Sequence, residues 1–166
     1  MDYQQWIGKP WTSLDTPALC VDLDTLQRNI ARMAALARDA GVALRPHIKT
    51  HKCPHIAQML LAAGADGITC AKVSEAEVMV DAGITDILIA NQIVGMFKIQ
   101  RLVSLAKRSQ LTVAVDHADN VAMLSQEAER AGVTIGVLIE VDVGMGRCGV
   151  APLEPTLTLA RIVDAS

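Results

Sequence analysis

The sequence predicts an α/β protein in which a parallel sheet is covered by helices. Short apolar runs alternate with longer segments whose apolar residues recur every three or four positions, and Gly, Asp or Asn stands at the junctions. Three helical segments end in similar phrases, AAGADGI, DAGITDI and RAGVTIG, each with a glycine stop before a new apolar run. The repeating unit is one strand and one helix, which is typical of a (β/α)8 barrel or an open doubly wound sheet.

About six such units follow one another along the chain. Asp24 or Thr25 is expected to cap the first helix, and Ser74 with Glu77 to form a capping box at the start of the third. Because a (β/α)8 barrel usually needs about 250 residues, a chain of 166 residues predicts an incomplete barrel. The strands are expected at residues 18–23, 42–49, 67–70, 86–91, 112–116 and 135–143.

The composition limits the kinds of molecule that the protein is expected to bind. Hydrophobic residues make up 51% of the chain, and the net charge of -3 comes from interspersed acids and bases, so no basic surface for nucleic acid or for an anionic membrane is expected. No apolar run reaches the roughly 18 residues of a membrane span. Four cysteines without a C-x-x-C pair indicate a reducing compartment, and we expect a cytoplasmic protein with a small-molecule partner.

The second predicted strand, residues 42–49, carries an unusual row of cations. Strand alternation places Arg45, His47 and Lys49 on one face. Such a row cannot face aliphatic helices without a large desolvation cost, so it points into a barrel lumen or a ligand site, or else lies on a solvated edge strand. Like charges crowding a lysine favour its neutral amine, which can bond an aldehyde cofactor. Lys49 is therefore a candidate attachment site for pyridoxal phosphate.

Histidines recur every four residues in the same region, at His47, His51 and His55. This spacing brings metal ligands together only on a helix, and Pro46 and Pro54 would break a helix that spanned all three. We predict no metal site here.

The segment GMGRCG, residues 144–149, follows a predicted strand and formally matches the G-x-G-x-x-G fingerprint of dinucleotide-binding proteins. That fingerprint opens a helix, whereas VAPLEP follows here. A glycine-rich turn at the carboxyl end of a barrel strand, exposing Arg147 to the ligand side, explains the same residues better.

Polar residues stand where three other predicted strands end. They are interpreted as helix caps, as partners of Arg45 or Arg147, or as catalytic acids, since the chemistry of barrel enzymes gathers at carboxyl ends. The residues are Asn91, Asp116, Glu140 and Asp142.

Several segments resemble the amino-terminal barrel of D-threonine aldolases and their relatives, in order and in spacing. They are LDTPALCVDLDTLQRNI, RPHIKTHKCP, ITCAKVSEAEVM, ILIANQIVG and EVDVGMGRCGV, and the resemblance covers residues 14–150. The relatives include 3-hydroxy-D-aspartate aldolases and eukaryotic-type D-serine dehydratases, all within the alanine-racemase-like fold of pyridoxal-phosphate enzymes. The resemblance implies a fold made of about six βα units of the alanine racemase N-terminal domain.

The resemblance also implies roles for particular residues. Lys49 would be the catalytic lysine that attaches pyridoxal 5'-phosphate, and Arg147 would lie near the phenolic oxygen of the cofactor. Lys52 would be a bystander. His47 and Arg45, which share the predicted face of Lys49, are expected to contact the cofactor as well. The aldolases often carry glutamine where this chain has Ala71, so one polar contact would be missing.

Full members of the resembled family are roughly twice as long. Their last barrel units supply a glycine-rich phosphate cradle and a carboxyl-terminal β-domain supplies divalent-metal ligands, and this sequence contains neither. We divide the chain into a leader, 1–13, and a partial barrel domain, 14–166. The implied activity is cleavage of D-β-hydroxy-amino acids to glycine and an aldehyde, with the present chain inactive alone and the complete protein a homodimer.

Two alternatives to this activity remain open. The first is a dehydratase acting on D-serine or 3-hydroxyaspartate, which would use the same lysine. The second is a non-catalytic pyridoxal-phosphate-binding protein.

Overall fold

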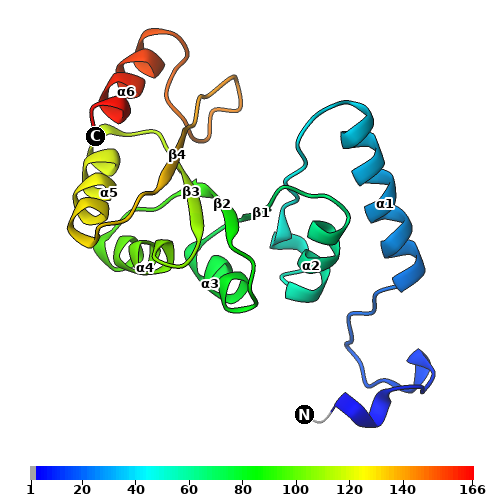
Figure 1. The fold of residues 1–166 in the computed structure, drawn as a ribbon. Helices are drawn as coiled ribbons and strands as arrows, with labels where there is room; N and C mark the ends of the chain where they lie inside the picture. Colours follow the sequence, from blue (N-terminus) through cyan, green and yellow to red (C-terminus); the bar gives the residue numbers. More distant parts are fainter. Residues whose placement is uncertain (1–2) are drawn as a thin grey trace.

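The computed structural model describes residues 3–166 as a four-stranded parallel sheet with helices packed on one side (Figure 1). The strands lie in the order β1-β2-β3-β4, with bounds Ile68–Cys70, Asp86–Gln92, Gln110–Val115 and Gly136–Ile139. The α-helices are α1 (Leu23–Asp39), α2 (Pro54–Ala62), α3 (Val73–Asp81), α4 (Met96–Ala106), α5 (Ala118–Ala131) and α6 (Glu154–Asp164). Three 3-10 helices are η1 (Tyr3–Trp6), η2 (Trp11–Ser13) and η3 (Ile48–Thr50).

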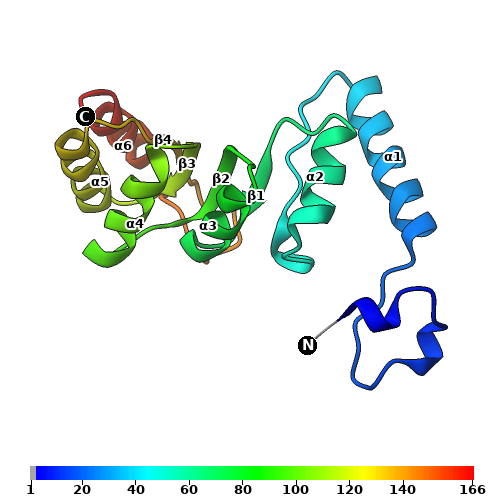
Figure 2. The same ribbon diagram turned by 60° about the horizontal axis from the view of Figure 1, so that its bottom comes forward.

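Helices α3 to α6 form an arc outside the sheet, whereas α1 and α2 lie beyond its β1 edge (Figure 2). None of the helices in residues 3–166 is long and apolar enough to cross a membrane.

The core lies between the sheet and the outer helices. Alternate residues of the central strands point outward and are buried, such as Ile87 and Ile89 of β2 and Val113 of β3. They pack against the apolar faces of the helices, which include Ile99 and Leu102 of α4. Each fully buried aliphatic side chain contributes about 1.5–3 kcal/mol, so this layer supplies most of the stabilisation of the sheet.

The opposite face of the sheet, which would line a barrel lumen, is partly open. Leu138 of β4 is 52% exposed on this side, and Ala90 of β2 is exposed as well. Consecutive parallel strands with one helix-covered face are the arrangement of a (β/α)8 barrel wall.

The first predicted strand is wrong. Residues 18–22 run as irregular chain and α1 begins at Leu23, with Leu19 and Val21 exposed to solvent. An apolar run becomes a strand only when a neighbouring strand pairs with its backbone. No such neighbour lies beside this run among the described residues.

The second predicted strand is wrong over most of its length. Only His47 makes a strand-type bridge, to Thr69 of β1, and the chain then tightens into η3. Pro46 has no N–H to offer a ladder, and its carbonyl accepts the N–H of Thr69 at 2.7 Å. The structure therefore contains four of the six predicted strands, each close to its expected place.

The cap of α1 also differs from the prediction. Asp22, not Asp24 or Thr25, precedes the helix, and its carboxylate accepts the N–H of Thr25 at 2.7 Å. Because the expected strand does not form, the helix begins two or three residues earlier than predicted.

The predicted capping box of α3 does not form. The helix begins at Val73, which places Ser74 inside it, and the Glu77 carboxylate pairs instead with Arg101 of α4. Glu75 reaches back to accept the N–H of Ala71 at 2.7 Å, so a different acid of the same turn ties the helix to the end of β1.

Candidate functional site

Lys49 lies at the carboxyl edge of the sheet. The parallel bridge joins His47 to Thr69 of β1, and the chain then turns into η3, which carries Lys49 two residues past this bridge in the carboxyl direction. Gln92 ends β2, and the residues that follow β3 and β4 come to the same edge. In barrels of parallel strands this is the edge where ligands bind.

The turn that carries Lys49 is anchored on its amino side. The side chain of Ile48 is fully buried, and Nδ1 of His47 accepts the backbone N–H of Lys49 at 3.2 Å. The carbonyl of Ile48 accepts the N–H of His51 at 3.1 Å, which closes the 3-10 turn. The side chain of Lys49 itself is exposed and makes no ion pair with any of residues 3–166. Its backbone is therefore held while its amine is free to react.

The histidines beside Lys49 are shifted toward their neutral forms. Burial, together with the positive charge of Lys49, lowers the pKa of His47 below its usual value, and the nearby Glu75 carboxylate opposes this shift. Burial also lowers the pKa of His51. Two neutral imidazoles at this edge leave Lys49 less crowded by positive charge than the sequence suggests.

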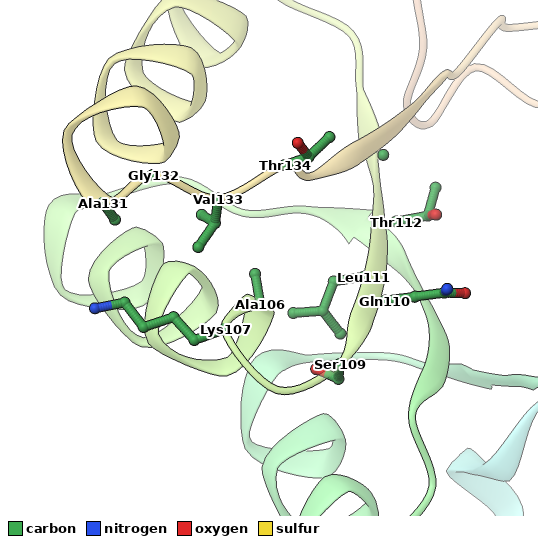
Figure 3. Close-up of a pocket in the computed structure, with 11 residues that line it drawn as sticks. Ala106, Lys107, Ser109, Gln110, Leu111, Thr112, Ala131, Gly132, Val133 and Thr134 are labelled. Carbon is green, nitrogen blue, oxygen red and sulfur yellow. The ribbon is translucent and has the colours of Figure 1, made fainter.

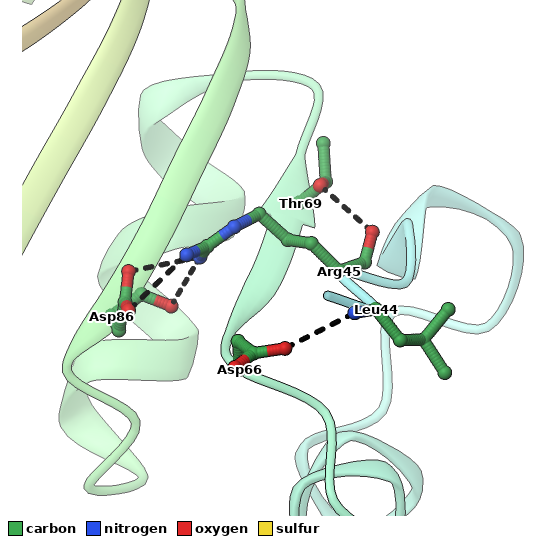
Figure 4. Close-up of polar contacts among 5 residues, drawn as sticks. All are labelled: Leu44, Arg45, Asp66, Thr69 and Asp86. Carbon is green, nitrogen blue, oxygen red and sulfur yellow. Dashed lines mark hydrogen bonds and ion pairs between the residues drawn. The ribbon is translucent and has the colours of Figure 1, made fainter. Parts of the chain in front are cut away.

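Arg45 points away from the carboxyl edge (Figure 4). Its guanidinium forms a two-point ion pair with Asp86, the first residue of β2, with Nη1–Oδ1 at 2.8 Å and Nη2–Oδ2 at 3.2 Å. The guanidinium passes over Gly67, where a side chain would collide with it. Its contact with a cofactor stays a prediction, and its observed partner lies at the amino end of the strands.

A polar cluster joins the carboxyl ends of three strands. The side-chain amide of Gln92 donates to Asp116 at 2.9 Å and to Glu140 at 2.6 Å, and Asp116 also accepts the N–H of Gly149 at 3.0 Å. These two acids are thus partners of Gln92 and not of Arg45, as the sequence had left open. Sequence reasoning missed Gln92 because one glutamine in an apolar run carries no distinctive signal.

The remaining candidate at this edge, Asn91, lies beside β1. Its side-chain amide donates to the carbonyl of Ala71 at 3.2 Å, and its side-chain oxygen accepts the N–H of Gln92 at 3.0 Å. It therefore links the ends of β1 and β2.

The glycine-rich segment 144–149 is a closed turn. One carboxylate oxygen of Asp142 accepts the N–H groups of Gly144 and Gly146, each at 3.0 Å. These hydrogen bonds, first that of Gly146, lower the pKa of Asp142. A bridge between Val141 and Val150 closes the turn, and α6 begins only at residue 154. The dinucleotide interpretation is therefore not supported. Arg147 is exposed in this segment, and its contact with a ligand stays a prediction.

The three histidines of the rejected metal motif have separate partners. Nδ1 of His51 accepts the N–H of Cys53 at 3.0 Å, and Nδ1 of His55 lies 3.4 Å from the side-chain oxygen of Gln58. Across residues 3–166, no group of three or more His, Cys, Asp or Glu side chains converges as a metal site would require.

A surface pocket lies at the opposite end of the sheet (Figure 3). It measures about 650 Å³, and its lining includes Ser109 and Thr134 of the loops that lead into β3 and β4, and Thr112 of β3. Lys107 is its only ionisable lining residue among the described part of the chain. In proteins built on this pattern the amino ends of the strands serve stability, so the chemistry is sought at the carboxyl edge.

Comparison with known families identifies this architecture. The family described as "Alanine racemase, N-terminal domain" matches residues 21–166. The chain belongs to the alanine racemase N-terminal domain family. This confirms the fold class inferred from the sequence, an α/β fold that forms part of a (β/α)8 barrel.

Several similar proteins are named as aldolases or dehydratases of D-amino acids. A D-threonine aldolase of Arthrobacter sp is 49% identical over 154 residues, which are 93% of this chain and 41% of the relative. The crystal structure of D-threonine aldolase from Filomicrobium marinum has a TM-score of 0.90 at 49% identity, covering 92% of this chain and 41% of that one.

The structure of D-threo-3-hydroxyaspartate dehydratase from Delftia sp. HT23 has a TM-score of 0.82 at 38% identity, covering 92% of this chain and 41% of that one. The chain thus spans about 41% of the length of the relatives it matches. Family membership and the resemblance to D-threonine aldolases are confirmed, while the domain boundaries and the roles of single residues stay predictions.

Proposed function

We propose that this chain is the cofactor-binding part of a pyridoxal-phosphate-dependent lyase that cleaves D-β-hydroxy-amino acids to glycine and an aldehyde. The observation that carries the proposal is the state of Lys49, an exposed amine without an ion-pair partner among the described residues, on an anchored turn at the carboxyl edge. The 49% identical D-threonine aldolase supports the reaction class.

The residues at this edge fit pyridoxal phosphate in their chemistry. Lys49 offers a primary amine for covalent attachment, and the exposed Arg147 offers a guanidinium for an anionic oxygen. His47, whose pKa is lowered, presents a neutral ring next to the attachment point. Arg45 is the weakest member of the predicted set, because Asp86 already occupies its guanidinium.

When bound, the cofactor supplies an electron sink for the bond that breaks beside the substrate amino group. The chain itself positions the groups around that chemistry. Ile48 and the His47 imidazole hold the backbone of Lys49, so its Nζ would be presented from a fixed turn, first to carry the cofactor and then, once the substrate amine has displaced it, to move a proton at the substrate carbon.

A dehydratase activity is the second candidate, since the Delftia sp. HT23 dehydratase is also similar to this chain. The two reactions differ in their products. With D-threo-3-hydroxyaspartate, an aldolase yields glycine and glyoxylate, whereas a dehydratase expels the hydroxyl and yields oxaloacetate and ammonia. From the complete protein we expect glycine, and oxaloacetate as the main product would replace the aldolase proposal by the dehydratase one.

The attachment lysine is tested separately from turnover. The purified chain is incubated with pyridoxal phosphate, reduced with borohydride and digested, and the modified lysine is identified by mass spectrometry. We expect the modification at Lys49, its loss in Lys49→Arg, and its persistence in the control Lys107→Arg. Modification at another lysine in the wild type would overturn the assignment, and stable attachment without turnover of any D-amino acid by the complete protein would favour a non-catalytic binding protein.

A further inference from the structure

The turn that carries Lys49 ends on a residue with an unusual backbone. Lys52 has a φ of 49°, in the left-handed region that side-chain-bearing residues rarely adopt. Its N–H donates to the carbonyl of Ile48 at 2.7 Å, which terminates the turn, and Pro54 then starts α2. Glycine or asparagine is the usual residue at such an end. A lysine at this position suggests that its side chain makes a contact that glycine or asparagine could not make.

The side chain of Lys52 reaches a buried carboxylate. Its Nζ lies 3.2 Å from Oε1 of Glu75, which is only 7% exposed. The other oxygen of Glu75 accepts the N–H of Ala71 at 2.7 Å, at the end of β1. Burial alone would raise the pKa of Glu75, but the Ala71 N–H and the Lys52 ammonium outweigh it and the pKa is lowered. Glu75 thus ties the end of the turn to the end of the strand.

This contact distinguishes two exposed lysines three residues apart. The amine of Lys49 has no ion-pair partner among residues 3–166, whereas the amine of Lys52 is held against Glu75. The backbone between them is fixed at one end by the His47 imidazole and at the other by Lys52.

We propose that Lys52 is a positioning residue for Lys49 and that its pair with Glu75 directs an aldehyde cofactor to Lys49 instead of Lys52. This inference rests on the proposed attachment of pyridoxal phosphate. The role of Lys52 is to end the turn and to hold it on the end of β1. The role of Glu75 is to occupy the competing amine.

The experiment measures where and how fast pyridoxal phosphate becomes attached to the full chain. As the carbon–nitrogen bond forms, the aldehyde oxygen leaves as water, and borohydride then supplies hydride that makes the bond permanent. Peptide mapping gives the ratio of modified Lys49 to modified Lys52. In the wild type we expect nearly all of the label on Lys49.

Removing either partner should change this ratio. Lys52→Met is expected to slow labelling of Lys49 about tenfold, because small displacements of a reacting group cost rates of this order or more. Glu75→Gln is expected to move a substantial share of the label to Lys52. Lys52→Arg, which keeps the charge and the reach, should restore labelling of Lys49 to within about twofold.

The matched control is Lys72→Met. Lys72 stands next to the start of α3, lines the same small cavity as Glu75, and forms no ion pair with it among the described residues. We expect the rate of labelling of Lys49 in Lys72→Met to stay within about twofold of the wild-type rate. An equal slowing in this control would show a general charge effect and would overturn the proposal.

Folding is checked in every variant by circular dichroism and thermal unfolding. If Lys52→Met does not fold, Lys52→Gly replaces it, because glycine accepts the left-handed backbone and removes only the side chain. Faster amide hydrogen exchange at Lys49 and Thr50 is expected in Lys52→Gly without any cofactor present. Wild-type exchange and wild-type labelling in a folded Lys52 variant would refute the positioning role. Failure of the wild type to label at Lys49 would instead refute the proposed function.

Discussion

Arg45 and Asp86 form a two-point ion pair that crosses from the segment before η3 to the first residue of β2. The carbonyl of Arg45 also accepts the hydroxyl of Thr69, at 3.3 Å, so both ends of the residue are held (Figure 4). The pair connects the irregular segment that precedes Lys49 with the amino end of the sheet. It is a structural contact, placed at the end of the strands opposite to Lys49.

Asp86→Asn is expected to lower the free energy of unfolding by about 1–2 kcal/mol, because the ion pair with Arg45 loses its negative charge. The effect is limited because solvent screens the partly exposed pair. Urea denaturation followed by circular dichroism measures this change. The matched control is Asp81→Asn, which removes a carboxylate from the exposed pair with Arg108 and should cost at most about 0.5 kcal/mol. Equal effects in the two variants would contradict a special role for Arg45 and Asp86.

Ile48→Ala is expected to destabilise the chain by about 2–4 kcal/mol, since the side chain is fully buried and its removal leaves a cavity next to the turn of Lys49. Ile7→Ala removes the same atoms from a residue that is 74% exposed and should change stability by less than about 0.5 kcal/mol. The free energies are measured by denaturant titration. A small effect at Ile48 would mean that the turn is not anchored through the core.

The lowered pKa of Glu75 predicts a loss of stability in acid. Its pKa in the folded protein lies below the ordinary value of 4.5, so the carboxylate stabilises the fold above that pH, and the contribution disappears as the pH falls through the folded value. The midpoint temperature of unfolding, measured from pH 7 to pH 3, should fall less steeply in Glu75→Gln than in the wild type. Glu129→Gln, at an exposed position of α5, is the control for loss of one carboxylate. Parallel curves for the wild type and Glu75→Gln would refute the prediction.

Two glycines of the loop that presents Arg147 should respond differently to alanine. Both have positive φ, 120° at Gly144 and 101° at Gly149, but a Cβ at Gly149 would lie 2.6 Å from the backbone nitrogen of Asp142, whereas nothing lies within 4 Å at Gly144. Gly144→Ala should therefore cost about 1 kcal/mol of strain, and Gly149→Ala about 1–3 kcal/mol more. Thermal unfolding of the two variants provides the comparison. Similar losses of stability in the two would show that the loop can move away from the backbone of Asp142.

Periodicity was sufficient to predict strands β1 to β4 and the helices around them. Their apolar residues face one shared core, so the same alternation that marks each strand in the sequence also marks its buried face. The segments at 18–23 and 42–49 show a similar pattern, yet they do not become strands. A strand needs a hydrogen-bonding neighbour, and the sequence of a segment does not say whether one will be beside it.

The predictions for the candidate site also differ in how far the sequence alone could support them. Residue types and the family resemblance pointed to Lys49 and to Arg147, and their roles stay predictions; in the structure Lys49 lies exposed on the 3-10 turn η3. The sequence also suggested that Arg45, His47 and Lys49 share one face. That arrangement fails because the strand gives way to η3 after His47, and the register argument ends with the strand.

By itself, the sequence determined the α/β class and the one-strand-one-helix repeat, because these follow from local periodicity, whereas the preference for Lys49 over Lys52 came from the family resemblance. Only the tertiary structure decided which partners the polar groups have: Asp86 for Arg45, Gln92 for Asp116 and Glu140, and Glu75 for Lys52. Each of these pairs joins residues more than 20 positions apart. Pairing over such distances depends on how the helices bring the strand ends together, which no local pattern encodes.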